Sequence, residues 1–184
     1  MKNILSKVYK KLRIIHNIYI KNRFLFTKKS YSMEGEDLEI LRLSNDTNNG
    51  FYVDVGCYHP THLNNTFLLY KKNWRGINID ISEFSIDLFN HLRPEDKNIN
   101  CAISNVDEEI DYYHQKEISQ LTTIKEAEAK KRMQGPIKKR KIQSYRLTTI
   151  LNRSKFSNRK IDFLNIDLEG ADLDALKSLD FEIY

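Results

Sequence analysis

The stretch FYVDVGC, residues 51–57, decides the fold of this chain. An apolar run that ends at an acidic residue and a glycine is typical of a buried parallel strand leading into a tight turn. A second apolar run, GINID at 76–80, also ends in a carboxylate, Asp80. A carboxylate at this place in an open α/β sheet commonly holds a ribose diol. The two runs therefore predict a nucleoside-type cofactor lying across the carboxyl ends of two strands.

The residues after Gly56 separate the candidate cofactors. A pyrophosphate needs close approach of the backbone, which is why dinucleotide sites carry three glycines in G-x-G-x-x-G. Here CYHP follows at 57–60, so the second and third glycines are missing. S-adenosylmethionine has a ribose and an adenine but no phosphates. Its binding therefore does not require the close backbone approach that the missing glycines would allow. The pattern favours S-adenosylmethionine over NAD. The third interpretation is an ordinary α/β domain in which Asp54 and Asp80 only cap strand ends.

The charge of the chain is unevenly distributed. Its 184 residues carry a formal net charge of +5, but residues 1–33 hold nine of the 30 Lys and Arg and no acid. The remaining residues therefore set 21 basic side chains against 25 acidic ones. This length suits one domain with a sizeable core. Because the body is mildly acidic, we expect no nucleic-acid-binding surface on it.

Residues 1–30 predict a basic helical arm in front of the domain at 31–184. Apolar residues such as Leu5, Val8 and Leu12 recur among lysines at helical spacing. The charges recur too often for a transmembrane span, and no small-residue cleavage site marks a signal peptide. A basic amphipathic helix can make peripheral contact with an anionic membrane. A helix that docks on the body and a leader segment are the alternatives.

The two cysteines predict a reducing compartment. Two residues are too few for a secreted disulfide framework. In the expected strand order a strand separates Cys57 from Cys101, which is about 9–10 Å and too far for a disulfide. We expect two reduced thiols in a cytoplasmic protein.

Strands and helices are expected to alternate along the chain. The predicted strands are 51–55, 76–80, 99–103, 109–114, 145–149 and 161–166. The predicted helices open at Ser32 and cover 61–72, 83–92, 124–134 and a last segment that holds Leu173, Leu176 and Leu179. The basic run at 138–141 is interpreted as a solvated patch. Such alternation predicts a doubly wound, mostly parallel α/β sheet with right-handed crossovers.

Further acidic and imidazole side chains extend the predicted site. Asp167 and Glu169 follow the strand at 161–166, on the same rim as the two earlier strand ends. Such a pair can serve as cofactor ligand, general base or cation site. No third ligand type has convincing spacing, so no metal site is predicted. His59 could accept a proton near neutral pH, or it could be a packing residue at a helix start.

Four blocks, taken together, resemble the FkbM family of S-adenosylmethionine-dependent methyltransferases. They are YSMEGEDLEIL (31–41), GFYVDVGCYHPTHLNNTFLLYKKNWRGINIDIS (50–82), INCAIS (99–104) and IDFLNIDLEGADLDALKSLDF (161–181). The resemblance implies a class I methyltransferase fold with strand order 3-2-1-4-5 (Rossmann-like). It also implies O-methylation of a sugar or of another small-molecule or polysaccharide hydroxyl, so that the expected partner is a small-molecule or glycan acceptor.

The resemblance also assigns residues. The positions that match cofactor-binding positions of the family are Glu36, Asp54, Gly56, Asp80, Ala102, Ile103 and Asp167. Ala102 and Ile103 are expected beside the adenine. Asp80 stands where the family more often has glutamate, which is one methylene longer, so its contact to the diol is expected to be weaker or water-mediated. The candidate catalytic residues are Asp167, Glu169 and His59.

The family continues through a fifth strand, whereas this sequence stops at Tyr184. The resemblance therefore implies a sheet that is incomplete at the C-terminus, with the strand at 161–166 as an unpaired edge. A truncated, non-catalytic fragment that still binds the cofactor is the corresponding alternative function.

Overall fold

The computed structural model describes residues 2–20, 30–44 and 47–184. Parts of the predicted arm (21–29) and of the turn before the first strand (45–46) lie outside these residues. The helices are α1 (Lys2–Ile15), the π-helical turn η1 (His16–Ile20), α2 (Glu36–Leu43), α3 (Phe67–Lys71), α4 (Glu83–Leu92), α5 (Glu126–Arg132), α6 (Leu147–Asn152) and α7 (Asp172–Lys177). The strands are β1 (Phe51–Val55), β2 (Arg75–Asp80), β3 (Lys97–Asn100), β4 (Ala102–Ile103), β5 (Glu109–His114), β6 (Lys138–Tyr145) and β7 (Phe163–Ile166).

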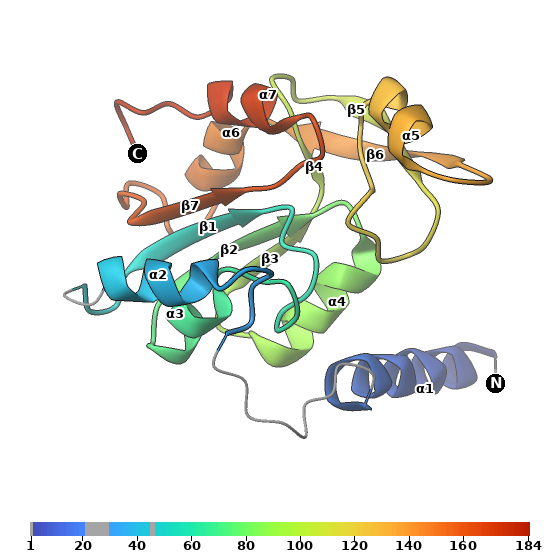
Figure 1. The fold of residues 1–184 in the computed structure, drawn as a ribbon, viewed down its shortest axis with the longest axis horizontal. Coiled ribbons are helices and arrows are strands. Elements are labelled where there is room, and N and C mark those ends of the chain that lie inside the picture. Colours follow the sequence, from blue (N-terminus) through green and yellow to red (C-terminus); the bar gives the residue numbers. More distant parts are fainter. Residues whose placement is uncertain (1, 21–29, 45–46) are drawn as a thin grey trace.

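The centre of the protein is a parallel four-stranded sheet in the order β3-β2-β1-β7. Helices α2, α3 and α4 cover one face, and α6 and α7 cover the other (Figure 1). This arrangement confirms the predicted Rossmann-like, doubly wound α/β fold. With β7 as the fourth strand, the order also agrees with 3-2-1-4. Among the described strands, β7 pairs only with β1.

One face of the sheet is apolar throughout. Phe51, Val53 and Val55 alternate along β1 and are buried on this face. They share one core cluster with side chains of β2, α6 and α7, among them Ile77, Ile79, Leu147, Leu151 and Ala175. The run FYVDV is buried over its whole length because helices pack on both faces, as is usual for parallel sheets.

The opposite face carries a row of polar side chains. Asn98, Asn78, Asp54 and Asn165 lie side by side in register on β3, β2, β1 and β7. Asn78 donates to Asn98 Oδ1 over 2.8 Å, and Asn165 donates to Asp54 Oδ1 over 2.9 Å. Burying polar groups is costly unless they are hydrogen-bonded, so this row holds the strands in one register.

A buried guanidinium joins the polar row to the loop before α3. Arg93, directly after α4, is fully buried. It donates to Thr66 Oγ1 over 2.8 Å and to Asn64 Oδ1 over 2.6 Å, and it also donates to the carbonyl oxygen of Pro60. Thr66 in turn donates to Asp54 Oδ2 over 2.7 Å. The chain of contacts from Arg93 to Asp54 ties loop 58–66 to the central strand.

A second, three-stranded sheet in the order β4-β6-β5 stands beside the first. The predicted strand at 99–103 divides into β3 and β4, which belong to different sheets and are separated by Cys101. The basic run at 138–141 is exposed, in agreement with the predicted solvated patch, and it forms the start of β6. Cross-strand ion pairs, Lys139 to Asp111 (2.8 Å) and Lys141 to Glu109 (2.9 Å), allow these like charges to follow one another in a strand.

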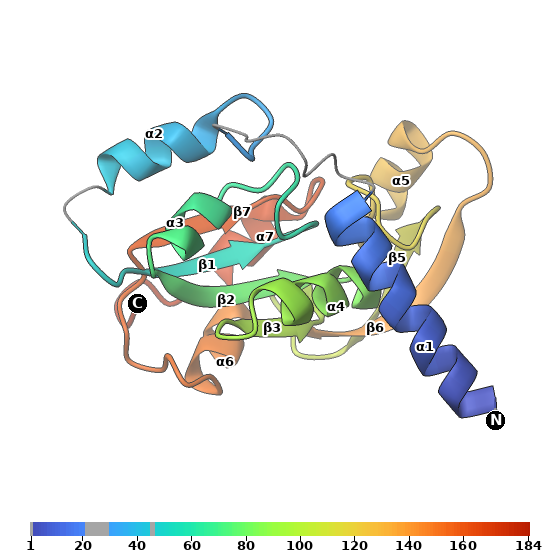
Figure 2. The same ribbon diagram turned by 90° about the horizontal axis from the view of Figure 1, so that it is seen from below.

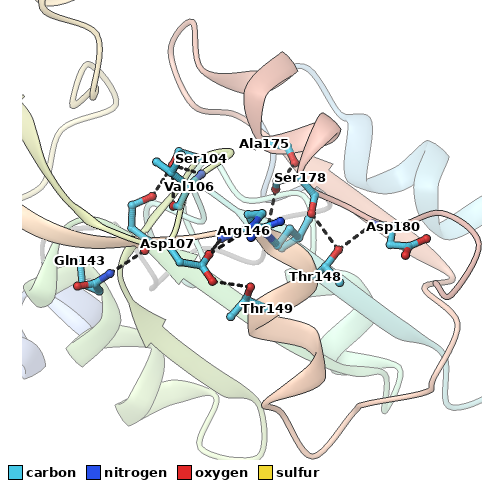
Figure 3. Close-up of polar contacts among 12 residues, drawn as sticks. Ser104, Val106, Asp107, Gln143, Arg146, Thr148, Thr149, Ala175, Ser178 and Asp180 are labelled. Carbon is cyan, nitrogen blue, oxygen red and sulfur yellow. Dashed lines mark hydrogen bonds and ion pairs between the residues drawn. The ribbon is translucent and has the colours of Figure 1, made fainter.

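The predicted strand at 145–149 is wrong, because helix α6 begins at Leu147. Distant side chains satisfy the free donors at the start of this helix. Asp107 accepts from the N–H of Arg146 and from the hydroxyl of Thr149, as Figure 3 shows. Ser178 Oγ accepts the N–H of Leu147 over 2.9 Å. The local β-branched pattern is overridden because tertiary partners cap the helix.

Two predicted helix starts also lie too early. The helix expected at Ser32 begins at Glu36, since Ser32 Oγ accepts the backbone N–H groups of Gly35 and Asp37 and shapes a loop there. The helix expected over 61–72 is only Phe67–Lys71. Residue Leu63 has φ of 51°, which is incompatible with a right-handed helix.

Cys57 and Cys101 are both buried and free, in agreement with the prediction. Within the described ranges, no helix combines the length and the apolar character that a membrane crossing requires.

Replacing Arg93 by methionine is expected to lower the free energy of unfolding by about 3–5 kcal/mol, because it leaves Asp54 and its hydrogen-bonding partners buried without their cation. Urea unfolding at pH 7, followed by circular dichroism, measures the change. Arg42→Met is the matched control, since the one ion pair of Arg42 among the described residues is with Glu39 on the exposed face of α2. The control should leave the unfolding midpoint unchanged, and equal losses in the two variants would contradict the role of Arg93.

Candidate functional site

A cavity of about 60 Å³ lies at the carboxyl ends of β1, β2 and β7. We call it the rim cavity. Its walls include Asp54, Gly56, Tyr58, Asp80, Asn165 and Asp167, with Ser119, Gln120 and Thr122 from the loop after β5. A larger cavity of about 510 Å³ adjoins it and shares Ile81 and Thr122 with it. We call this one the hairpin cavity, because α1, the start of α4, Asn100 and the β5–β6 hairpin line it.

Gly56 shapes the rim cavity by a close approach of two strand ends. It has φ of 81°, and its N–H donates to the carbonyl oxygen of Ile79 over 2.9 Å. A Cβ atom at this position would overlap the carbonyl oxygen of Asp167. The glycine is therefore required both by its backbone conformation and by the contact between the turn after β1 and the end of β7.

The carboxylate of Asp54 is fully engaged with the protein. It is buried and accepts hydrogen bonds from Thr66, Asn64 and Asn165. Burial raises the pKa of Asp54 above its usual range, although these hydrogen bonds oppose the shift. Asp54 therefore organises the amide groups around the cavity.

The carboxylate of Asp80 is held by the backbone of two turns. It accepts the N–H of Tyr58 over 2.8 Å and the N–H of Ser82 over 2.7 Å. Burial raises the pKa of Asp80 to about 6, and the negative charge of Asp54 adds to this effect. The group lies where the rim cavity meets the hairpin cavity, next to Ile81.

Asp167 offers an unused carboxylate to the rim cavity. The residue is exposed, with part of its carboxylate shielded from water in the cavity, and its side chain accepts no hydrogen bond from the residues that the structure describes. Burial raises the pKa of Asp167, and the negative charges of Asp172 and Asp54 raise it further. A carboxylate with a raised pKa and free lone pairs is suited to accept a proton.

The structure places the other two candidate catalytic residues outside the walls of the rim cavity. The carboxylate of Glu169 forms an ion pair with Arg132 of α5, and its carbonyl oxygen accepts from Thr123 Oγ1 over 3.0 Å. His59 is buried, and its Nδ1 accepts the N–H of Thr61 over 3.2 Å. Both side chains hold neighbouring segments in place.

The remaining predicted cofactor residues also lie outside the rim cavity and the hairpin cavity. Glu36 is at the exposed start of α2 and accepts the N–H of Glu34 over 2.8 Å. Ala102 and Ile103 are buried in β4, paired with β6. Asn100 lines the hairpin cavity instead. The structure thus brings together Asp54, Gly56, Asp80 and Asp167.

Several wall residues were not predicted from the sequence. Asn65 donates to Asn165 Oδ1 over 3.0 Å, so two amides extend the chain of contacts from Asp54. An amide inside the apolar run FLNI was a readable signal for Asn165, because a polar side chain in a buried strand needs a partner. Ser119, Gln120 and Thr122 lie in a loop whose sequence gives no such signal.

The family profile named Methyltransferase FkbM domain matches residues 54–184, from the end of β1 through α7. The chain belongs to the FkbM methyltransferase family. No curated protein and no solved structure matches it significantly. The family match covers the glycine turn and the three strand ends around the rim cavity. The described part of this FkbM methyltransferase contains no group of three or more His, Cys, Asp or Glu side chains that could hold a metal ion.

Gly56→Ala is expected to destabilise the fold by about 2–5 kcal/mol, because the left-handed conformation and the overlap with Asp167 both oppose a side chain. Thermal unfolding measures the loss. Gly35→Ala is the matched control: Gly35 also has positive φ, of 95°, but open space surrounds its Cα. It should cost only about 1 kcal/mol. An equal loss in both variants would show that conformation alone requires the glycine.

Proposed function

We propose that the protein transfers a methyl group from S-adenosylmethionine to a hydroxyl group of a small-molecule or glycan acceptor. The observation that carries this proposal is the rim cavity, where Asp80 and Asp167 meet around a turn with a single glycine. Tyr58 stands where a pyrophosphate site has its second glycine, and its bulky side chain lines the cavity together with Leu63. The same observation disfavours NAD.

The residues present fit an adenosine with a short amino-acid tail. The rim cavity alone is too small for the whole molecule, since ligands of this size occupy about 300–1,000 Å³. The hairpin cavity continues from Ile81 toward Asn100, the last residue of β3, which is the next strand in the sheet. Asp80, between the two cavities, would accept hydrogen bonds from the ribose. The amides of the rim cavity would face the amino-acid end, and Ile81 and Asn100 would face the adenine.

When bound, the sulfonium supplies an activated methyl donor. The protein then has to align a hydroxyl with it and remove a proton. We assign Asp167 as the general base that accepts this proton, because its carboxylate faces the rim cavity without a hydrogen-bonding partner among the described residues. Glu169 is occupied by Arg132, and His59 is buried behind the turn. The buried free thiols of Cys57 and Cys101 support a cytoplasmic location for this reaction.

Isothermal titration calorimetry with S-adenosylhomocysteine, S-adenosylmethionine and NAD tests the cofactor. Binding of the first two and not of NAD supports the proposal, whereas binding of NAD alone would overturn it. Release of S-adenosylhomocysteine in the presence of hydroxylated sugars tests the reaction. Cofactor binding without turnover on any hydroxyl acceptor would favour a non-catalytic binding protein.

The affinity for S-adenosylhomocysteine is expected to fall as the pH is lowered through about 6. Below this pH Asp80 becomes protonated and loses the charge that favours the diol, so the dissociation constant should rise up to about tenfold per pH unit. Asp80→Asn, titrated by calorimetry from pH 7.5 to 5, should bind weakly with little pH dependence. A steep dependence that persists in this variant would exclude Asp80 as its source.

Asp167→Asn is expected to lower kcat by about 10²–10⁴-fold while leaving the dissociation constant for S-adenosylhomocysteine nearly unchanged, because it removes the proton acceptor alone. Asp174→Asn on α7, where the carboxylate pairs with Lys125 over 2.5 Å, is the matched control and should keep its activity. Unchanged turnover in Asp167→Asn would exclude Asp167 as the general base.

A further inference from the structure

Helix α1 contacts the body of the protein through its polar face. Lys10 forms an ion pair with Asp87 of α4 over 2.7 Å, and Arg13 pairs with Glu117 in the loop after β5. The guanidinium of Arg13 also lies over the ring of Phe84, 4.4 Å from its centroid. These contacts form one wall of the hairpin cavity.

The apolar face of the same helix points away from the body. Leu5, Val8 and Leu12 follow one another at helical spacing and are 65%, 51% and 59% exposed. We call them the α1 stripe. Figure 2 shows α1 running past α4, with its N-terminus beyond the rest of the protein. An amphipathic helix that only docks on a globular body buries its apolar stripe against that body. Helix α1 does the opposite, because its polar face meets the body and its apolar face meets solvent.

Free cations flank the α1 stripe. Lys7 and Lys11 are exposed and one turn apart, and neither forms an ion pair with a residue of the described ranges. In contrast, Asp87 and Glu117 neutralise Lys10 and Arg13 on the inner face. The sequence from 1 to 33 holds nine basic residues and no acid. The occupant of this face must therefore be apolar on one side and negatively charged beside it.

We propose that α1 docks this protein on an anionic lipid bilayer. The helix would lie in the plane of the interface, with the α1 stripe at the acyl boundary and with Lys7 and Lys11 among the headgroups. A second copy of the chain is a poor occupant, since pairing two such helices would bring two strongly basic segments together. This inference goes beyond methyl transfer and does not depend on it.

Docking by the outer face of α1 would bring the hairpin cavity close to the lipid. Lys10 and Arg13 line this cavity from the inner face of the same helix. Only the diameter of one helix, about 10–12 Å, then separates the cavity from the bilayer surface.

Cosedimentation of the full chain with phosphatidylcholine vesicles, with and without phosphatidylglycerol, tests the proposal. We expect binding only to the vesicles that contain phosphatidylglycerol, and we expect high salt to weaken it. Lys7→Gln with Lys11→Gln should weaken binding about 25-fold, that is, about fivefold for each lysine. Lys97→Gln with Lys177→Gln, two exposed lysines of the body, is the matched control and should bind as the wild type does.

The triple variant Leu5→Gln, Val8→Gln and Leu12→Gln should lose binding by about 100-fold. Its control is the triple variant Met33→Gln, Leu43→Gln and Leu173→Gln, whose side chains are 69%, 72% and 61% exposed elsewhere on the protein. Because all these side chains are exposed, thermal unfolding should be unchanged in each variant.

Four outcomes would overturn the proposal. They are no binding of the wild type to either vesicle, equal binding to both vesicles, equal losses in the two triple variants, and a lipid-free dimer in sedimentation equilibrium that the α1-stripe variant abolishes. The last outcome would identify a second copy of the chain as the occupant. Cofactor binding, measured in parallel, reports separately on the proposed methyl transfer.

Discussion

The rest of the structure depends on a buried network that runs from Arg93 to Asp54 across one face of the sheet. A guanidinium without water needs acceptors, and the loop before α3 supplies them through Asn64 and Thr66. The same two side chains donate to Asp54, so one network fixes both the loop and the central strand. The rim cavity is therefore shaped by groups that cannot move independently, and this rigidity suits a site in which a methyl group must be aligned.

Three carboxylates line the rim cavity, and each has a different hydrogen-bonding environment. Asp54 is saturated by side-chain donors, Asp80 accepts two backbone N–H groups, and Asp167 accepts nothing from the described residues. Burial raises the pKa of all three. A carboxylate whose lone pairs all accept hydrogen bonds organises its neighbours. One with some lone pairs left can accept hydrogen bonds from the hydroxyls of a diol, and one without hydrogen-bonding partners can accept a proton. Their different hydrogen-bonding environments thus support the roles that we propose for similar side chains.

The second sheet and α1 extend the same site outward. The loop after β5 closes the rim cavity with Thr122, and Thr123 Oγ1 ties this loop to the carbonyl oxygen of Glu169. Glu117 of the same loop reaches Arg13 of α1. The helix that we propose to meet the lipid is thus joined through a single loop to the candidate active site. The loop after β5 therefore connects the proposed lipid contact of α1 with the proposed site of methyl transfer.

Apolar runs in the sequence predicted β1, β2 and β7, because runs of this kind can be buried only between two helical layers. The order of these strands in the sheet was expected only from the family resemblance. The strand ends at Asp54, Gly56, Asp80 and Asp167 followed from the same pattern. The sequence could not reveal that α6 would replace a strand, since its capping partners Asp107 and Ser178 are distant in the chain. Nor could it show which carboxylates stay free, because Arg132 reaches Glu169 but not Asp167 only in the folded chain. Local patterns thus predict the strands of the central sheet. Partners brought from far along the chain decide whether 147–152 is a strand or a helix, where other helices start and which side chains remain available for chemistry.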